Sequence, residues 1–150
     1  MLFRSLPPST VDTHPMDATS TSVLGFALDR VWGALRTAYD SVGVPVSTFD
    51  AATHTVGNSA LRVRRRLGDV ALSKYINCGN TQGGNGADTY EVVFSLVSRT
   101  VPAESGMTRL TTVIDAQGRP ITLGGEYTRC TSTGVLEKRL SQLVISQLNR

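Results

Sequence analysis

Residues 90–99 read YEVVFSLVSR and decide the fold. Apolar and polar side chains alternate along this stretch, as in a strand with one buried face and one face toward water. The buried face would hold Tyr90, Val92, Phe94 and Leu96, and the opposite face Glu91, Ser95 and Arg99. A strand of this kind needs a cover over its apolar face, and that cover must come from elsewhere in the chain.

The residues that follow predict two further strands. A polar break over Pro102–Gly106 precedes a strand from Met107 to Ile114. Asp115–Gly118 is typical of a hairpin turn, and a last strand is expected from about Pro120 to Cys130. Gly124-Gly125 within that strand indicates a bulge. Short turns between consecutive strands favour antiparallel pairing.

The residues before the central strand predict two strands and a short helix. Val44–Phe49 is the first strand, and a second is expected from about His54 to Arg64, with a helix over 60–67 as the alternative. Ala71–Asn77 is typical of two helical turns, and the glycine-rich segment Gly79–Asp88 of a loop. The short helix would turn Leu72, Tyr75 and Ile76 toward the core.

Two longer helices are predicted near the ends of the chain. The first begins near Asp29, whose carboxylate would cap it, and ends at Gly43. The second follows Thr133, also a predicted cap. Their apolar stripes are Leu28, Val31, Trp32, Leu35, Ala38, Tyr39 and Val42, and Leu136, Leu140, Leu143, Val144 and Leu148. We therefore expect an α+β fold with an antiparallel sheet of about five strands, an N-terminal and a C-terminal helix packed on one face, and the other face open.

Length and composition set the domain organisation. The chain has 150 residues and a mass of 16.1 kDa, which suits one domain, and we place a single α+β domain at 23–150. Residues 1–22, rich in Pro, Ser and Thr, are expected to be a disordered or linker segment. Residues 1–5 match the translated end of a common sequencing adapter, so we expect an assembly artefact there; a genuine disordered start is the alternative.

The sequence predicts neither a catalytic centre nor a cofactor or metal site. His14 lies in the expected linker, and His54 has no nearby cysteine or serine nucleophile motif to activate. Asp88 and Glu91 are explained as solvated loop charges at least as well as by a carboxylate pair. The loop over Gly83–Asp88 lacks the lysine of a phosphate-binding loop and leads into a strand. We therefore predict that the chain is not an enzyme.

An arginine cluster is the main charge feature of a chain with a net charge of +3. Arg62, Arg64, Arg65 and Arg66 fall within five positions and could contact phosphates. No base-reading motif accompanies them, so a solvated strand face, a protein or membrane surface and, least of all, nucleic acid are the alternatives. If Arg99 and Arg109 lie beside this run on the open sheet face, the basic surface becomes larger.

Cys78 and Cys130 are the two cysteines, 52 positions apart. This spacing does not fit a zinc or redox motif, and both residues fall at the ends of expected elements. We predict a disulfide between them, with two buried free thiols as the alternative. Disulfides persist in oxidising compartments.

These observations favour a non-catalytic, exported domain of the cell envelope or periplasm that binds another protein through its open sheet face. A linker of the expected kind commonly separates such a domain from a signal peptide or lipid anchor. The partner and the oligomeric state are unknown, and no stretch is long and apolar enough to cross a bilayer. The alternative is a small cytoplasmic nucleic-acid-binding domain that uses the Arg62–Arg66 run.

Overall fold

The computed structural model describes residues 11–14, 19–81, 84–121 and 125–150. Its longer strands are β2 (Thr19–Leu24), β4 (Thr55–Arg64), β10 (Tyr90–Pro102), β11 (Thr108–Pro120) and β12 (Thr128–Ser132), and its helices are α1 (Leu28–Ser41) and α2 (Val135–Leu148). Shorter strands are β1 (Val11–His14), β3 (Thr48–Asp50), β5 (Arg66–Leu67), β6 (Val70–Ala71), β7 (Ile76–Asn77), β8 (Asn80–Thr81) and β9 (Gly84–Asn85). Single 3-10 turns lie at η1 (Leu72–Lys74), η2 (Gly86–Asp88) and η3 (Glu104–Gly106).

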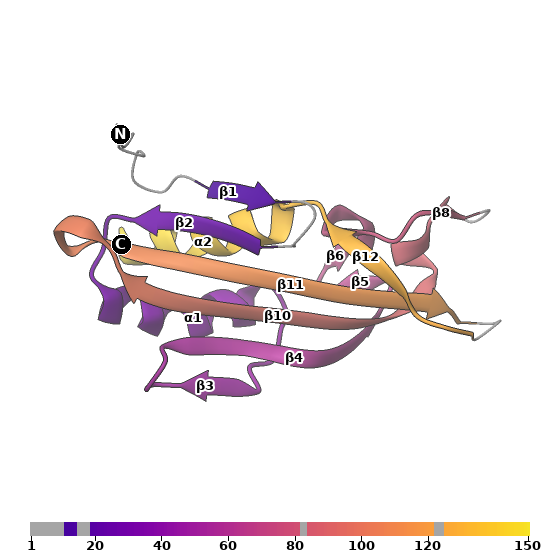
Figure 1. Cartoon of the computed structure of the whole chain (residues 1–150), viewed down its shortest axis with the longest axis horizontal. Helices are drawn as coiled ribbons and strands as arrows, with labels where there is room; N and C mark the ends of the chain where they lie inside the picture. Colours follow the sequence, from indigo (N-terminus) through magenta and orange to yellow (C-terminus); the bar gives the residue numbers. More distant parts are fainter. Residues whose placement is uncertain (1–10, 15–18, 82–83, 122–124) are drawn as a thin grey trace.

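The main sheet is antiparallel and has eight strands, more than the five or so expected. Its order is β1-β2-β11-β10-β4-β3, with β12 pairing β11 and β7. At its centre, β10 and β11 form a long hairpin in which all thirteen residues of each strand are paired (Figure 1). The predicted strands at 54–64 and 90–99 are confirmed by β4, which begins one residue later at Thr55, and by β10, which continues to Pro102.

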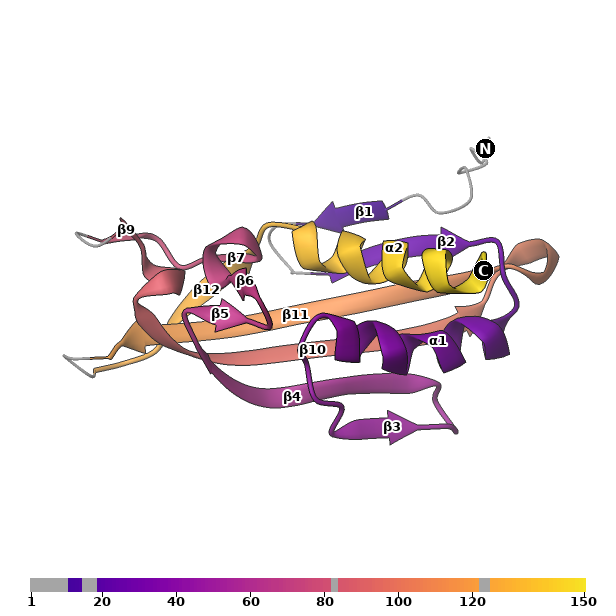
Figure 2. The same ribbon diagram turned by 180° about the vertical axis from the view of Figure 1, so that it is seen from behind.

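Both helices lie on the same face of this sheet (Figure 2). Val31, Leu35 and Tyr39 of α1 and Leu136, Leu140 and Val144 of α2 are buried against it. Together with Val92, Phe94 and Leu96 of β10 they form one hydrophobic core. The α+β class and the position of the two helices are therefore as the apolar periodicity predicted.

The predicted helix caps were wrong in two cases of three. The N-cap of α1 is Ala27, which makes no side-chain cap hydrogen bond, and Asp29 lies in the first turn. The N-cap of α2 is Gly134, one residue after Thr133. The Thr133 hydroxyl donates to the carbonyl oxygens of Lys74 and Tyr75 and accepts a hydrogen bond of 3.4 Å from the Val135 amide. Gly43 follows the C-cap of α1 with φ +84°, the left-handed conformation expected of it.

The hairpin turn expected at Asp115–Gly118 is absent, and β11 runs through these residues to Pro120. Ala116 is buried opposite Phe94, and a Cβ atom on Gly118 would lie 2.9 Å from Cδ2 of Tyr90. Gly118 is thus required by the close approach of an aromatic ring rather than by a turn. The last strand accordingly starts later, at Thr128.

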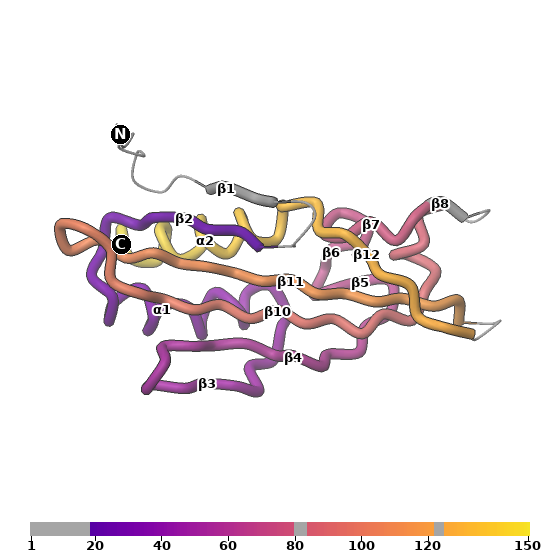
Figure 3. The backbone as a smooth tube through the Cα atoms, viewed as in Figure 1, coloured from indigo at the N-terminus to yellow at the C-terminus, as the bar shows by residue number. Residues whose placement is uncertain are grey.

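The segment between β4 and β10 folds over one end of the sheet, beside β12 (Figure 3). The helix expected over 71–77 is reduced to η1, because Ile76 and Asn77 pair with β12 instead of continuing the helix. Leu72, Tyr75 and Ile76 are nevertheless buried, as predicted. The expected loop over 79–88 contains β8, β9 and η2 among its described residues.

The ordered sheet reaches into the segment expected to be a linker. β2 begins at Thr19, and both Ser20 and Ser22 are buried beneath the helices. The Ser22 and Ser141 hydroxyls form a hydrogen bond of 2.9 Å, which satisfies two polar groups in the core. The expected artefact at 1–5 and Gly124 of the expected bulge lie outside the described residues. The strand expected at 44–49 is wrong over 44–47 and overlaps β3 (Thr48–Asp50) only at its last two residues.

Candidate functional site

The side of the sheet away from the helices, which we call the open face, is built by alternation along β10 and β11. The even-numbered residues over 92–100 of β10 and 108–118 of β11, such as Val92 and Ile114, point toward the helices and are buried. The register therefore places the odd-numbered residues on the open face, in directly facing pairs. From one end to the other these pairs are Glu91–Arg119, Val93–Gln117, Ser95–Asp115, Val97–Val113, Arg99–Thr111 and Val101–Arg109.

Glu91 is the centre of a basic cluster at one end of the open face. Its carboxylate lies 3.4 Å from Arg62, 3.6 Å from Arg64 and 3.9 Å from Arg119. The Tyr127 hydroxyl also donates to it, and the guanidinium of Arg119 lies 4.6 Å from the centre of the Tyr127 ring. One carboxylate therefore forms ion pairs with three arginines, so this cluster keeps an excess of positive charge.

A hollow of about 460 Å³ lies further along the open face. We call it the Arg99 groove; its lining residues are Thr55, Val97, Arg99, Val101, Thr111 and Val113. Val97 faces Val113 directly across the two strands, and Val113 is 40% exposed. Arg99 stands between Thr55 of β4 and Thr111 of β11, so that a guanidinium rises from a mostly apolar floor.

The structure places four of the six arginines that we predicted to form a surface on the open face, in two separate groups. Arg62 and Arg64 lie beside Glu91 at one end, whereas Arg99 and Arg109 lie toward the other end, about 20 Å away along β10. Arg65 and Arg66 leave the main sheet, because Arg65 adopts φ +66° and Arg66 begins β5, which pairs with β6.

Sequence reasoning missed two arginines and the apolar part of this surface. Arg119 and Arg129 lie on the open face opposite Glu91 and Gln117. The alternation of Arg109, Thr111 and Val113 indicates the open side of this strand. The turn predicted at Asp115–Gly118 ended the expected strand before Arg119, so Arg119 was not assigned to the same face. The open-face positions of β3, β4, β10, β11 and β12 thus hold six arginines and three carboxylates. The arginines are Arg62, Arg64, Arg99, Arg109, Arg119 and Arg129, and the carboxylates are Glu91, Asp115 and Asp50, which pairs with Thr55.

The predicted disulfide is present between Cys78 and Cys130, with Cα atoms 4.3 Å apart. It ties the segment that follows β7 to β12, and the Cys130 side of the link is buried on the helix side of the sheet. The bond therefore fastens the end segment to the core and leaves the open face untouched.

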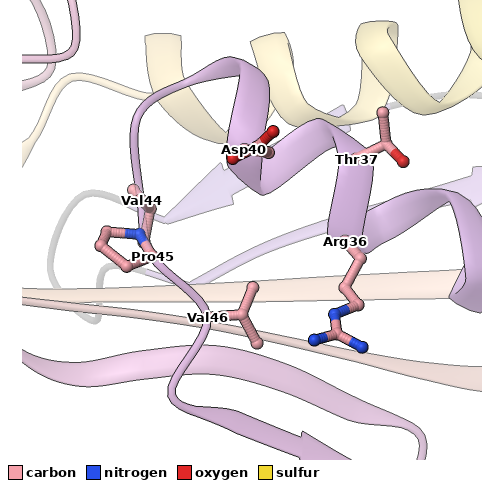
Figure 4. Close-up of a pocket in the computed structure, with 6 residues that line it drawn as sticks. All are labelled: Arg36, Thr37, Asp40, Val44, Pro45 and Val46. Atoms are coloured by element: carbon pink, nitrogen blue, oxygen red, sulfur yellow. The ribbon is translucent and has the colours of Figure 1, made fainter.

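A second hollow of about 310 Å³ lies between α1 and the segment that leads to β3 (Figure 4). Arg36 extends toward Val46, and Asp40 lies one turn further along α1. The guanidinium of Arg36 lies 4.6 Å from the centre of the Phe49 ring, which stacks on Trp32 at 4.4 Å. A cation–π contact with Phe49 therefore accounts for the position of the Arg36 side chain on the exposed surface of α1.

The side chains considered as candidate catalytic groups, His54, Asp88 and Glu91, each make contacts that position them within the fold. The His54 ring meets Trp32 edge-on at 5.3 Å, and the Asp88 carboxylate accepts a hydrogen bond from the Ser73 amide. Glu91 forms ion pairs with Arg62, Arg64 and Arg119. Within the described ranges, no group of three or more His, Cys, Asp or Glu residues is arranged to hold a metal ion.

One buried carboxylate lies apart from both hollows. Glu137 in the first turn of α2 is 1% exposed, and its Oε2 accepts a hydrogen bond of 2.6 Å from Ser132. Burial raises the pKa of the Glu137 carboxyl, and the Ser132 hydrogen bond offsets part of that rise. Its Oε1 is buried and has no hydrogen-bond partner among the residues that the structure describes.

The chain matches no protein-family model, and no curated protein matches it in sequence. No helix in the described part of the chain is both long and apolar enough to span a membrane.

Proposed function

We propose that this chain is a non-catalytic binding domain of an oxidising compartment, the cell envelope or periplasm, and that it binds another protein through its open face. The observation that carries the proposal is the contrast between the two sides of the sheet. One side is covered by α1 and α2, and the other presents an uncovered hollow of three valines around an arginine. Exposed apolar surface beside arginine is typical of protein interfaces.

The disulfide supports the proposed location in an oxidising compartment. Bonds such as that between Cys78 and Cys130 are rare in the reducing cytoplasm and persist after export. An exported domain requires a signal peptide or lipid anchor encoded upstream of the folded part. A cytoplasmic location is the alternative, and it predicts two free thiols in protein taken from cells.

Site-specific photo-crosslinking tests the binding face. A photoreactive amino acid replaces Val113 on the open face or, as a matched control, the exposed Gln142 on α2. After irradiation of the source cells, we expect a discrete crosslinked protein from position 113 and none from position 142. Crosslinks of equal yield from both positions, or from position 142 alone, would contradict the proposal.

Counting the free thiols of the protein in the same cells tests whether it resides in an oxidising compartment. Protein denatured in acid and alkylated without reductant should show no free thiol, because both cysteines are in the disulfide. Two alkylated cysteines would assign the chain to a reducing compartment and remove this part of the proposal.

Nucleic-acid binding is the second candidate, favoured by the excess of arginine on the open face. Arg62 and Arg64 are partly neutralised by Glu91, so the surface should release few counterions on binding. We expect at most micromolar, salt-dependent binding of short DNA and RNA in fluorescence anisotropy. Nanomolar, sequence-dependent binding that is lost in Arg64→Ala and Arg65→Ala would replace the protein-binding proposal.

A further inference from the structure

We propose that the occupant of the Arg99 groove is an acidic amphipathic α-helix of the partner protein. One carboxylate of this helix pairs with Arg99, and apolar side chains on either side of that carboxylate rest on the valines. This inference deepens the proposed function and rests on it.

The layout of the groove places one charge between two apolar contacts. Val97 and Val101 flank Arg99 at two residues on either side along β10, on the same face of the strand. Val113 adjoins Val97 from β11. A ligand that fills this groove therefore needs an apolar group, an anion and a second apolar group in a line.

The charges of the open face select an acidic ligand. Arg62, Arg64 and Arg119 share Glu91, whereas no described carboxylate lies within ion-pair distance of Arg99 or Arg109. Burying an unpaired guanidinium in an interface is costly, so the partner must supply the carboxylate. A second copy would present its own excess of arginine, and like charges would oppose face-to-face docking.

A helix suits the face of a sheet better than an extended segment does. The backbone groups of β10 and β11 are already paired with neighbouring strands, so the face offers no backbone partners to an incoming strand. An extended segment would lose water from its own amides without replacement, whereas a helix satisfies them internally.

The spacing of the groove fits two turns of helix. Val97 and Val101 are four residues apart along a strand, which is about 13 Å. Seven residues of helix advance about 10.5 Å and return to the same side. The expected ligand pattern is thus an apolar residue at i, Asp or Glu at i+3 or i+4, and an apolar residue at i+7.

A pair of designed peptides tests this chemistry on the full chain. The probe is a stapled helix of about sixteen residues with Leu at i and i+7 and Glu at i+4; the control peptide has Gln for Glu. By fluorescence anisotropy we expect the Glu peptide to bind about tenfold more tightly than the Gln peptide. Arg99→Gln should abolish this preference. Arg66→Gln, an exposed arginine outside the open face, should retain it.

Location and alternative occupants are resolved by three further measurements. Amide chemical-shift changes should centre on β10 and β11, and changes confined to the helices would overturn the proposal. So would equal affinity for the two peptides, or concentration-dependent dimerisation that Val113→Asp abolishes. Binding to vesicles of phosphatidylcholine and phosphatidylglycerol that needs Arg99, without a peptide preference, would assign the face to a membrane. A crosslink from Val113 to a cellular protein without peptide preference would retain the proposed function and overturn only the acidic helix.

Discussion

Val92 and Val93 are neighbours in the chain and lie in opposite environments. Val92 is fully buried under the helices, whereas Val93 stands on the open face between Arg62 and Gln117. The same alternation separates the two faces along the whole β10–β11 hairpin. Residues on the helix side stabilise the fold, and residues on the open face are those that the proposed partner would contact. We therefore expect substitutions to change stability and the proposed binding independently.

Polar groups are also paired differently on the two faces of the sheet. On the helix side, the Tyr39 hydroxyl meets Ser98 at 2.8 Å, and Ser98 meets Thr112 at 2.9 Å. Burial raises the pKa of the Tyr39 hydroxyl above its ordinary value, although the hydrogen bond with Ser98 opposes the rise. On the open face, charged groups such as Glu91 and Arg62 pair at the border with water, where an ion pair contributes little to stability.

The largest expected effect comes from the covalent link on the helix side. Replacing both cysteines, by Cys78→Ser with Cys130→Ser, should lower the free energy of unfolding by about 4 kcal/mol, because a long loop regains its entropy in the unfolded chain. Urea denaturation measures the loss, and reduced wild-type protein is the control, since it should match the double variant. An unchanged midpoint would show that the end segment stays in place without the bond.

A matched pair of valines tests the two faces directly. Val92→Ala should lower the free energy of unfolding by about 2 kcal/mol, because it leaves a cavity in the core. Val93→Ala should cost about 0.5 kcal/mol or less, because its side chain borders water. Equal losses in urea denaturation would mean that the open face is part of a second core.

The pH dependence of stability reports on Glu137. Since burial raises its pKa in the folded state above the unfolded value, the folded protein favours the protonated carboxyl. The stabilising contribution is present at low pH and is lost as the pH rises through the raised pKa. Glu137→Gln should therefore gain stability relative to wild type as the pH rises above the unfolded-state pKa of about 4.3. Thermal unfolding at several pH values measures the difference, and parallel curves for the two proteins would exclude a raised pKa.

The smallest effect is expected from the arginines around Glu91. Arg62→Ala should change the free energy of unfolding by about 0.5 kcal/mol or less, because its side chain is 74% exposed. Arg119→Ala should cost somewhat more, since Arg119 is 35% exposed and also contacts the Tyr127 ring. Both differences should shrink at high salt in urea denaturation. A loss from Arg62→Ala comparable to that from Val92→Ala would show that the open face stabilises the fold.

Local patterns of the sequence predicted the elements whose neighbours are close in the chain. The 3.6-residue period of α1 and α2 and the two-residue period of β4 and β10 appear directly in the spacing of apolar residues. The positions of Cys78 and Cys130 at the ends of expected elements, together with the linker expected of an exported domain, favoured a disulfide, and the structure confirms it. These features identified the fold class and the open face.

Elements whose conformation depends on distant residues were predicted wrongly. Ser20 and Ser22 are typical of a linker by composition, yet they are buried in β2, where Ser22 meets the Ser141 hydroxyl of α2. Gly118 is typical of a turn, but the ring of Tyr90 requires it within β11. In both cases the deciding contact lies at least 28 positions away along the chain, beyond the reach of local propensity.

The sequence by itself determined that one side of the central strand is continuously apolar, whereas the other side mixes charged and polar residues with valines, because side chains alternate along any strand. Only the tertiary structure decided which residues share the open face. The register of β4, β10, β11 and β12 brings Arg62, Arg99, Arg109 and Arg129 onto one side and sends Arg65 and Arg66 elsewhere. The physical reason is that alternation is a property of each strand alone, whereas register depends on cross-strand hydrogen bonds and on the side chains packed beneath them.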